Sequence, residues 1–267
     1  MNSAYIHGYD LHENNRLQDQ AADLIDLLHG DTFYPAGSRI LEAGCGVGAQ
    51  TITLAQRNPD VSIVSIDISP DSIAQAEQRL RAAGFTNVAF QQGDLFNLPF
   101  AAQSFDHVFV CFVLEHLPHV QEALQRLKVL VKPNGTITVI EGDHGSTYFY
   151  PESSAAQAVI DCQVKLQAAA GGNARIGRAL YPLLTAAGYR DVSVSPRMVY
   201  VDARTPNRVE GFTKKTFIAM IEGVRAAALA AGIIDAQTFD QGIADLVRTT
   251  APDGTFCYTF FKATGRA

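Results

Sequence analysis

The stretch that decides the fold is ILEAGCGVGAQTITLA, residues 40–55. Its apolar residues surround an acid, Glu42, and glycines follow at Gly44, Gly46 and Gly48. Glycine accepts positive φ angles and lets a ligand approach the backbone closely, so a glycine-rich turn between a strand and a helix commonly cradles a nucleotide-like ligand. The stretch predicts such a turn, and the residues around it decide which ligand the turn suits.

Strand and helix patterns alternate from about residue 39 to residue 143. Strands joined by helices lie parallel, so this order predicts an α/β fold with a parallel sheet that helices cover on both faces. Beyond residue 143 the sequence predicts four further helical segments and two more strands. The expected strands are 38–44, 61–69, 87–94, 104–114, 136–143, 191–203 and 254–265.

The composition excludes several classes of function. The chain has 267 residues, of which 47% are hydrophobic and 18% charged, as in an ordinary soluble globular protein. Its net charge of -6 argues against nucleic acid as a partner, because phosphate binding needs clustered Lys and Arg. No apolar run approaches the roughly 18 residues of a membrane span, and the polar N-terminus lacks a signal peptide, so we expect a cytoplasmic protein. The four cysteines form no C-x-x-C pair, so neither a disulfide framework nor a zinc site is expected.

The spacing of the glycines leaves two kinds of ligand open. A triphosphate is excluded, because the P-loop pattern needs a Lys that is absent here. A dinucleotide is not excluded: Gly44, Gly46 and Ala49 satisfy G-x-G-x-x-G/A, and Asp67 lies about 20 residues further on, where ribose is held.

Three other features favour a ligand without phosphates. Glu42 precedes the glycines by two residues, and a carboxylate there suits an ammonium or sulfonium group better than a pyrophosphate. Asp94 follows the third strand, where it could accept a hydrogen bond from an adenine amine. The fourth strand, within 104–114, leads into a polar cluster instead of another phosphate-binding turn.

Five successive motifs resemble those of class I S-adenosylmethionine-dependent methyltransferases. They are ILEAGCGVGAQT, SIDIS, GDLFNLPF, SFDHVFVCFVLEHL and LVKPNGTITVIEGD, in that order over about residues 39–143. The sequence is most similar to the small-molecule branch that includes the ubiquinone and menaquinone C-methyltransferases. The resemblance implies S-adenosylmethionine as cofactor. It also implies a Rossmann-like, doubly wound, mostly parallel seven-stranded sheet with an antiparallel C-terminal strand and added helices.

The resemblance also implies which residues bind the cofactor. Glu42 is expected to meet its amino group, Arg16 its carboxylate, and Asp67 both ribose hydroxyls. Asp94 is expected to take the adenine amine beside the Leu95 N–H. The whole expected set is Arg16, Glu42, Gly44, Gly46, Gly48, Gln50, Asp67, Ile68, Asp94, Leu95 and Cys111.

Candidates for the acceptor site follow the fourth and fifth strands, because ligands of open parallel sheets lie at the carboxyl ends of the strands. The segments are LEHLPH, residues 114–119, and EGDHGSTYFYPE, residues 141–152. Imidazoles and phenols over an apolar floor suit a flat heteroaromatic acceptor, such as a secondary metabolite, and can remove its proton. We expect His144 to be the general base, Tyr9, His116 and Tyr148 to bind the acceptor, and no metal to take part.

We expect residues 1–38 to form an N-terminal helical lid. Residues 39–267 are expected to form the methyltransferase domain, with a helical insertion at about 205–252 that caps the acceptor site. The sequence leaves open whether C, N, O or S is methylated, and whether the protein is a monomer or a homodimer. Two alternatives are a dinucleotide-dependent oxidoreductase and a non-catalytic regulatory module that binds the cofactor.

Overall fold

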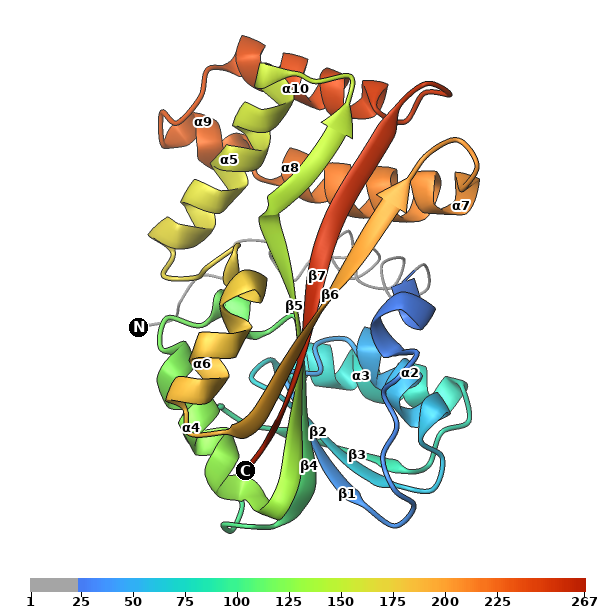
Figure 1. Ribbon diagram of the computed structural model, residues 1–267, viewed down its shortest axis with the longest axis vertical. Helices are drawn as coiled ribbons and strands as arrows, with labels where there is room; N and C mark the ends of the chain where they lie inside the picture. The colour runs from blue at the N-terminus through green and yellow to red at the C-terminus, as the bar shows by residue number, and fades with distance from the viewer. Residues whose placement is uncertain (1–23) are drawn as a thin grey trace. The chain divides into compact units, whose positions relative to one another are not determined.

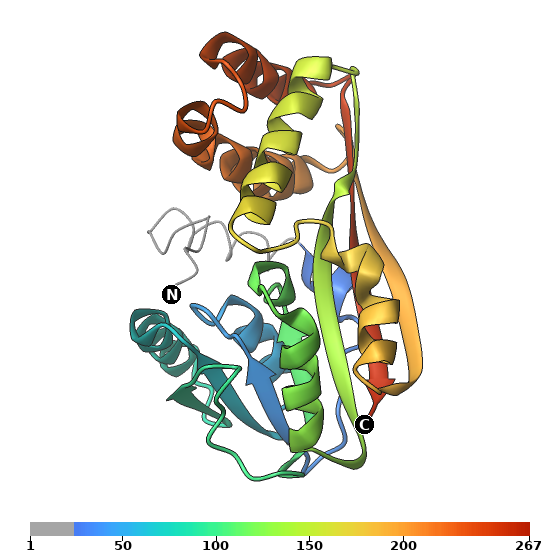
Figure 2. The ribbon, with the colours of Figure 1, turned by 90° about the vertical axis from the view of Figure 1, so that its left-hand side faces the viewer.

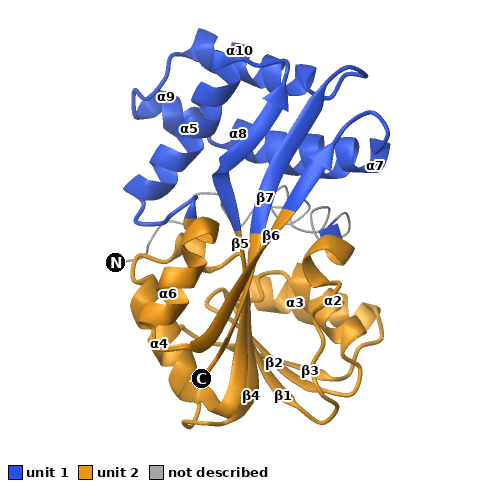
Figure 3. Cartoon of the chain, in the orientation of Figure 1, with its two compact units in different colours: residues 1–24, 142–175, 198–260 blue, residues 25–141, 176–197, 261–267 orange. Residues whose placement is uncertain are grey.

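The computed structural model describes residues 24–267 and divides into two compact units (Figures 1 and 3). Unit 2 contains residues 25–141, 176–197 and 261–267. Unit 1 contains, among the described residues, Leu24, 142–175 and 198–260. The helical insertion expected at about 205–252 falls inside unit 1, and its role as a cap stays a prediction.

One seven-stranded sheet runs through the chain in the order β3-β2-β1-β4-β5-β7-β6. The pairs β1–β2, β2–β3, β1–β4 and β4–β5 are parallel, and Figure 1 shows β7 running opposite to β5 and β6. The fold class expected from the sequence is therefore confirmed. The strands are β1 Arg39–Ala43, β2 Ser62–Asp67, β3 Val88–Gln92, β4 Phe105–Cys111, β5 Val131–Tyr150, β6 Arg190–Val201 and β7 Thr255–Arg266.

In unit 2 the helices lie on both faces of the sheet (Figure 2). Apolar side chains such as Leu41, Val108 and Val139 are fully buried in a core to which Leu124 and Leu184 also belong. Such continuous apolar strands are typical of parallel sheets covered on both sides. The elements are α2 Ala49–Arg57, α3 Pro70–Ala82, α4 Val120–Leu130 and α6 Leu180–Ala186, with the short 3₁₀ turns η1 Leu114–His116 and η2 Ile176–Ala179.

In unit 1 the helices pack on aromatic side chains of β7. Phe217 lies 4.8 Å from Phe256 between ring centroids, and Phe212 lies 5.9 Å from Tyr258. Gly242 lets α10 approach α5, because a Cβ there would stand 2.4 Å from the Ala155 carbonyl oxygen. The helices are α5 Ser154–Ala169, α7 Pro206–Arg208, the π-helix η3 Val209–Ile218, α8 Ala219–Gly223, α9 Arg225–Ala230 and α10 Ala236–Arg248.

The fifth strand is longer than the sequence predicted. We expected it at 136–143, followed by a loop that carries His144 and Tyr148, whereas β5 extends to Tyr150. Residues 146–150 are rich in Thr and aromatic side chains, which favour strands, and the Ser146 hydroxyl accepts a 3.0 Å hydrogen bond from Thr259 N of β7. The expected placement of His144 and Tyr148 after the strand was therefore wrong.

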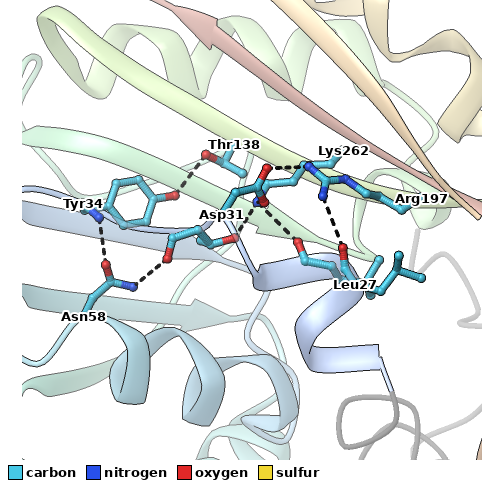
Figure 4. A network of polar contacts seen from close by, with 9 residues as sticks. Leu27, Asp31, Tyr34, Asn58, Thr138, Arg197 and Lys262 are labelled. Atoms are coloured by element: carbon cyan, nitrogen blue, oxygen red, sulfur yellow. Dashed lines mark hydrogen bonds and ion pairs between the residues drawn. The ribbon is translucent and has the colours of Figure 1, made fainter.

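A buried lysine anchors the first described helical segment, residues 24–29, to the sheet of unit 2 (Figure 4). Lys262 of β7 is only 4% exposed, and its ammonium group donates to the Asp31 carboxylate at 2.5 Å and to the Thr32 hydroxyl at 2.6 Å. Arg197 of β6 reaches the other oxygen of Asp31, also at 2.5 Å. Charge-assisted bonds of this kind are strong, so the segment before β1 has a fixed position.

Candidate functional site

The glycine turn joins β1 to α2 with three residues at positive φ. The φ angles are 81° at Gly44, 50° at Gly46 and 79° at Gly48. The N–H groups of Gly44 and Cys45 both donate to the Ile66 carbonyl of β2 at 2.9 Å, and Gly48 N donates to Cys45 O at 2.9 Å. Side-chain-bearing residues rarely adopt such angles, so the backbone path itself explains the glycines.

The space around each glycine shows which of them faces a ligand. A Cβ on Gly44 would stand 2.4 Å from Val113 Cγ2, and a Cβ on Gly48 would stand 3.0 Å from the Cβ of Ala76. Among residues 24–267, a Cβ on Gly46 would meet no atom within 4 Å. Gly44 and Gly48 therefore allow close packing within unit 2, whereas Gly46 leaves its backbone open to a ligand.

Asp67, the last residue of β2, shapes the turn with both of its carboxylate oxygens. Oδ2 accepts a 2.8 Å hydrogen bond from Gly46 N, and Oδ1 accepts a 2.9 Å bond from Ser69 N. A carboxylate oxygen can accept more than one hydrogen bond, so each also has capacity for a ligand hydroxyl.

Glu42 is buried below the turn, with 2% of its surface exposed. Its Oε2 accepts hydrogen bonds from Ser65 Oγ at 2.6 Å and from Thr51 Oγ1 at 2.8 Å. Burial raises the pKa of Glu42 to about 7, although the hydrogen bonds from these two hydroxyls act to lower it. Within the described part of the chain both hydroxyls bond to Oε2, which leaves Oε1 for a ligand cation.

The ends of β2 and β3 carry the residues expected around adenosine. Gly93 N donates to Asp67 O at 2.9 Å, which places Asp94 beside the end of β2. Asp94 is exposed and its Oδ1 accepts from Phe96 N at 2.9 Å, whereas Leu95 is buried. The Ile68 side chain is 60% exposed, an unusual state for isoleucine. An acid and an exposed apolar side chain thus follow the carboxyl ends of two neighbouring strands.

Gln50, at the start of α2, is bonded to a residue that the sequence did not point to. His29 Nε2 lies 2.8 Å from Gln50 Oε1. Burial lowers the pKa of His29 to about 4, so the ring is neutral and its Nε2–H donates to the amide oxygen. This contact leaves the Gln50 amide nitrogen for a ligand carboxylate.

Strand β4 ends in a turn that includes Phe112, a second feature missed in the sequence. Phe112 has φ 57°, and its N–H donates to the Ile140 carbonyl at 2.9 Å. Cys111 before it is buried, and burial raises the pKa of its thiol. His116 Nε2 lies 3.6 Å from Glu115 Oε1. A positive φ at phenylalanine has no sequence signature.

A family model described as a methyltransferase domain matches residues 35–188, which is more than half of the chain. The chain belongs to this methyltransferase family. The resemblance seen in the five sequence motifs is thereby confirmed, and the matched range contains the glycine turn and every cofactor candidate between Glu42 and Cys111.

The chain is similar to two proteins that are named as methyltransferases. It is 31% identical over 134 residues to 27-O-demethylrifamycin SV methyltransferase of Amycolatopsis mediterranei. The matched residues make up 50% of this chain and 49% of the relative. It is 30% identical over 106 residues to demethylmenaquinone methyltransferase of Bacillus cytotoxicus, covering 39% and 45%. The chain spans about half the length of the curated relatives it matches.

A solved structure shows the same fold. Phosphoethanolamine N-methyltransferase 2 of Haemonchus contortus, in complex with phosphomonomethylethanolamine and S-adenosylhomocysteine, aligns with a TM-score of 0.54 and 18% identity. The alignment covers 92% of this chain and 52% of that chain.

The candidate base of the methyltransferase lies in unit 1. His144 is 6% exposed, with Nδ1 2.9 Å from the Tyr258 hydroxyl and Nε2 3.3 Å from Met220 Sδ. A thioether accepts but cannot donate, so Nε2 carries the proton and Tyr258 donates to Nδ1. Tyr148 differs in being 70% exposed.

Tyr9, Arg16 and the rest of the expected lid up to residue 23 lie outside the described residues. Within residues 24–267, no three His, Cys, Asp or Glu side chains gather as a metal site. In the same part of the methyltransferase, no helix has both the length and the apolar character needed to cross a membrane.

Proposed function

We propose that the protein transfers a methyl group from S-adenosylmethionine to a small-molecule acceptor. The observation that carries this proposal is where the turn's N–H groups point. Those of Gly44, Cys45 and Gly46 donate to Ile66 O and Asp67 Oδ2, so they are not free to hold a phosphate. A pyrophosphate site uses free N–H groups of such a turn and of the helix after it, and these three are not available for that role. Family membership and the S-adenosylhomocysteine bound to the solved neighbour support the same ligand.

The residues fit each part of this cofactor. Its methionine end would lie over the open backbone of Gly46, with the amino group at Glu42 Oε1 and the carboxylate at the Gln50 amide and Arg16. Asp67 would accept the ribose hydroxyls while it holds the turn. Opposite charges at the methionine end and hydrogen bonds at the ribose together give orientation as well as affinity.

The adenine would lie between the ends of β2 and β3. Asp94 would accept its exocyclic amine beside the Leu95 N–H, and the exposed Ile68 would cover its ring. Cys111 at the end of β4 completes the expected set. Burial of an exposed Ile side chain contributes about 1.5–3 kcal/mol when it is complete.

When bound, the cofactor supplies an activated methyl group on a sulfonium. The protein's own task is to place the acceptor atom in line with that group and to exclude water. A general base is needed only where the acceptor carries a proton that must leave.

His144 with Tyr258 is our proposed base. Both nitrogens of His144 are occupied, so the proton path runs through the phenol. Tyr258 would take the acceptor's proton on its oxygen and pass its own proton to Nδ1, which forms an imidazolium that keeps Nε2–H on Met220. Tyr9, His116 and Tyr148 stay predicted acceptor contacts.

The net charge, the cysteines and the named relatives support a class of acceptor and a cellular compartment. Both relatives are named after small molecules, a rifamycin and a menaquinone, which supports an acceptor of that class. The net charge of -6 argues against nucleic acid. Four free cysteines are typical of a reducing compartment, in support of a cytoplasmic protein, and we infer a monomer or a homodimer.

The deciding experiment is titration calorimetry with S-adenosylmethionine, S-adenosylhomocysteine and NAD(H) in parallel. Binding of the first two and none of the third is expected; the reverse would establish the oxidoreductase alternative. Transfer of labelled methyl from S-adenosylmethionine into metabolites of an extract then tests catalysis. Binding without any transfer would favour the regulatory module.

A further inference from the structure

Glu141 is a fully buried acid in β5, and it makes none of the contacts expected for the cofactor. Its exposed fraction is 0%. Oε1 accepts hydrogen bonds from Leu114 N at 2.7 Å and from Val113 N at 3.0 Å. Oε2 is also buried and has no hydrogen-bond partner among the residues that the structure describes. Burying a carboxyl group is costly, so its position calls for a role.

The two amides belong to the turn that ends β4. Phe112 in this turn has φ 57°, a conformation that residues with a side chain rarely adopt. It is bonded to β5 through Ile140 O at 2.9 Å, and the next two amides are bonded to Glu141. Three consecutive N–H groups, from residues 112 to 114, thus end on β5. This set of bonds compensates for the unfavourable angle and fixes the turn.

The same turn touches the glycine turn of the cofactor site. Val113 Cγ2 and Cγ1 would lie 2.4 and 3.0 Å from a Cβ on Gly44. Val113 therefore fills the space that the missing side chain leaves. Any displacement of Val113 changes what supports Gly44, because protein interiors are closely packed.

We propose that Glu141 is a positioning residue of the cofactor site: by holding residues 112–114 it presses Val113 against Gly44 and so sets the shape of the glycine turn. The inference rests on the proposed function, since it names the cofactor as the ligand whose affinity depends on Glu141. Glu141 touches neither the cofactor nor the acceptor in this scheme.

The hydrogen bonds, and not a negative charge, are the useful property of Glu141. Burial, and then the charge of Glu115, raise the pKa of Glu141 well above its usual value, which favours the neutral acid. A neutral acid resembles a glutamine amide in shape, and both offer one acceptor oxygen. Glu141→Gln should keep the bonds to Val113 and Leu114, whereas Glu141→Leu keeps the volume and loses them.

The experiment compares these two variants by calorimetry with S-adenosylhomocysteine and by amide hydrogen exchange without ligand. Glu141→Gln is expected to bind within about 3-fold of the wild type. Glu141→Leu is expected to bind about 5- to 30-fold more weakly, with faster exchange at Val113 and Leu114. Glu122→Gln, an exposed acid of α4, is the control and should change neither measurement.

Each contrary result has a definite meaning. Unchanged cofactor binding and unchanged amide exchange in Glu141→Leu would overturn the proposal. It would also be overturned if Glu141→Gln bound S-adenosylhomocysteine as weakly as Glu141→Leu, because the negative charge would then be the requirement. If Glu141→Leu does not fold, Val113→Ala tests the contact with Gly44: weaker binding with normal protection of Leu114 is expected, and normal binding contradicts it. A wild type that binds no cofactor rejects the proposed function, while the exchange data still report on the turn.

Discussion

Substituting Gly46 by alanine separates the backbone requirement of the glycine turn from its ligand requirement. Gly46 has φ 50°, and a Cβ there would have no atom of the described residues within 4 Å. The folded protein therefore loses only the cost of a left-handed alanine, about 1–2 kcal/mol. For a chain of about this size, each kcal/mol corresponds to a fall in Tm of roughly 2–4 °C.

The chain offers a matched control at the end of α3. Gly84 has φ 80°, and in the described part of the chain a Cβ there would also meet no atom within 4 Å, but Gly84 belongs to no proposed ligand contact. Gly84→Ala and Gly46→Ala should therefore lose similar stability. Only Gly46→Ala places a methyl group where the cofactor is proposed to lie, and its affinity for S-adenosylhomocysteine should fall at least about tenfold, or 1.4 kcal/mol.

Gly44→Ala completes the comparison. Its φ of 81° carries the same cost as at the other two glycines, and its Cβ would also stand only 2.4 Å from Val113 Cγ2. This overpacking should lower the free energy of unfolding by about 1–3 kcal/mol more. Thermal unfolding and calorimetry on the three variants check the scheme. The reasoning is refuted if Gly46→Ala binds S-adenosylhomocysteine as the wild type does, or if it loses clearly more stability than Gly84→Ala.

Three further predictions concern single side chains. Asp67→Ala should weaken S-adenosylhomocysteine binding and lower Tm together, because it removes the bond to Gly46 N, worth about 1–3 kcal/mol if the amide stays unpaired; unchanged affinity in calorimetry rejects the ribose role. The folded pKa of Glu42 is raised from 4.5 to about 7, so its contribution to stability is full below 4.5 and is lost as pH rises through about 7. Cofactor affinity should instead rise through that range as the carboxylate forms, and Glu42→Gln should flatten both profiles; a wild-type affinity independent of pH contradicts this. His144→Ala and Tyr258→Phe should each lower turnover more than cofactor affinity, and the double variant should be no slower than the worse single variant; additive losses would refute a shared relay.

The order of strands and helices was predictable because its signals are local. Strands β1, β2 and β4 contain short apolar runs, and α3 begins as expected, with Ser69 accepting a hydrogen bond from Ser72 N and Pro70 in the first turn. The extension of β5 was not predictable in this way. β5 neighbours β7 in the sheet, and Ser146 bonds to Thr259, more than 100 positions away, a partner that no local sequence pattern records.

Part of the cofactor site was also predictable, because acids at strand ends stand out against apolar neighbours. Glu42 and Asp67 were selected by this contrast; both contact the turn or its supports, and their bonds to the cofactor stay predictions. Glu141 gives the same signal, an acid after the run TITVI, and was overlooked as part of a segment assigned to the acceptor. His29 and Phe112 gave no usable signal, since one acts through a distant partner and the other through a backbone angle.

The three glycines are each held by a different part of unit 2. Gly44 rests on Val113 of the turn after β4, Gly46 is bonded to Asp67 of β2, and Gly48 packs on Ala76 of α3. The motif permits the backbone path, but these neighbours select one path among those that glycine allows. Asp67 and the Ile66 carbonyl accept the N–H groups of Gly44, Cys45 and Gly46, so a pattern shared with dinucleotide sites can form a site for a sulfonium cofactor. Ligand choice at this turn is therefore a property of the packing of unit 2, and spacing of glycines alone could not determine it.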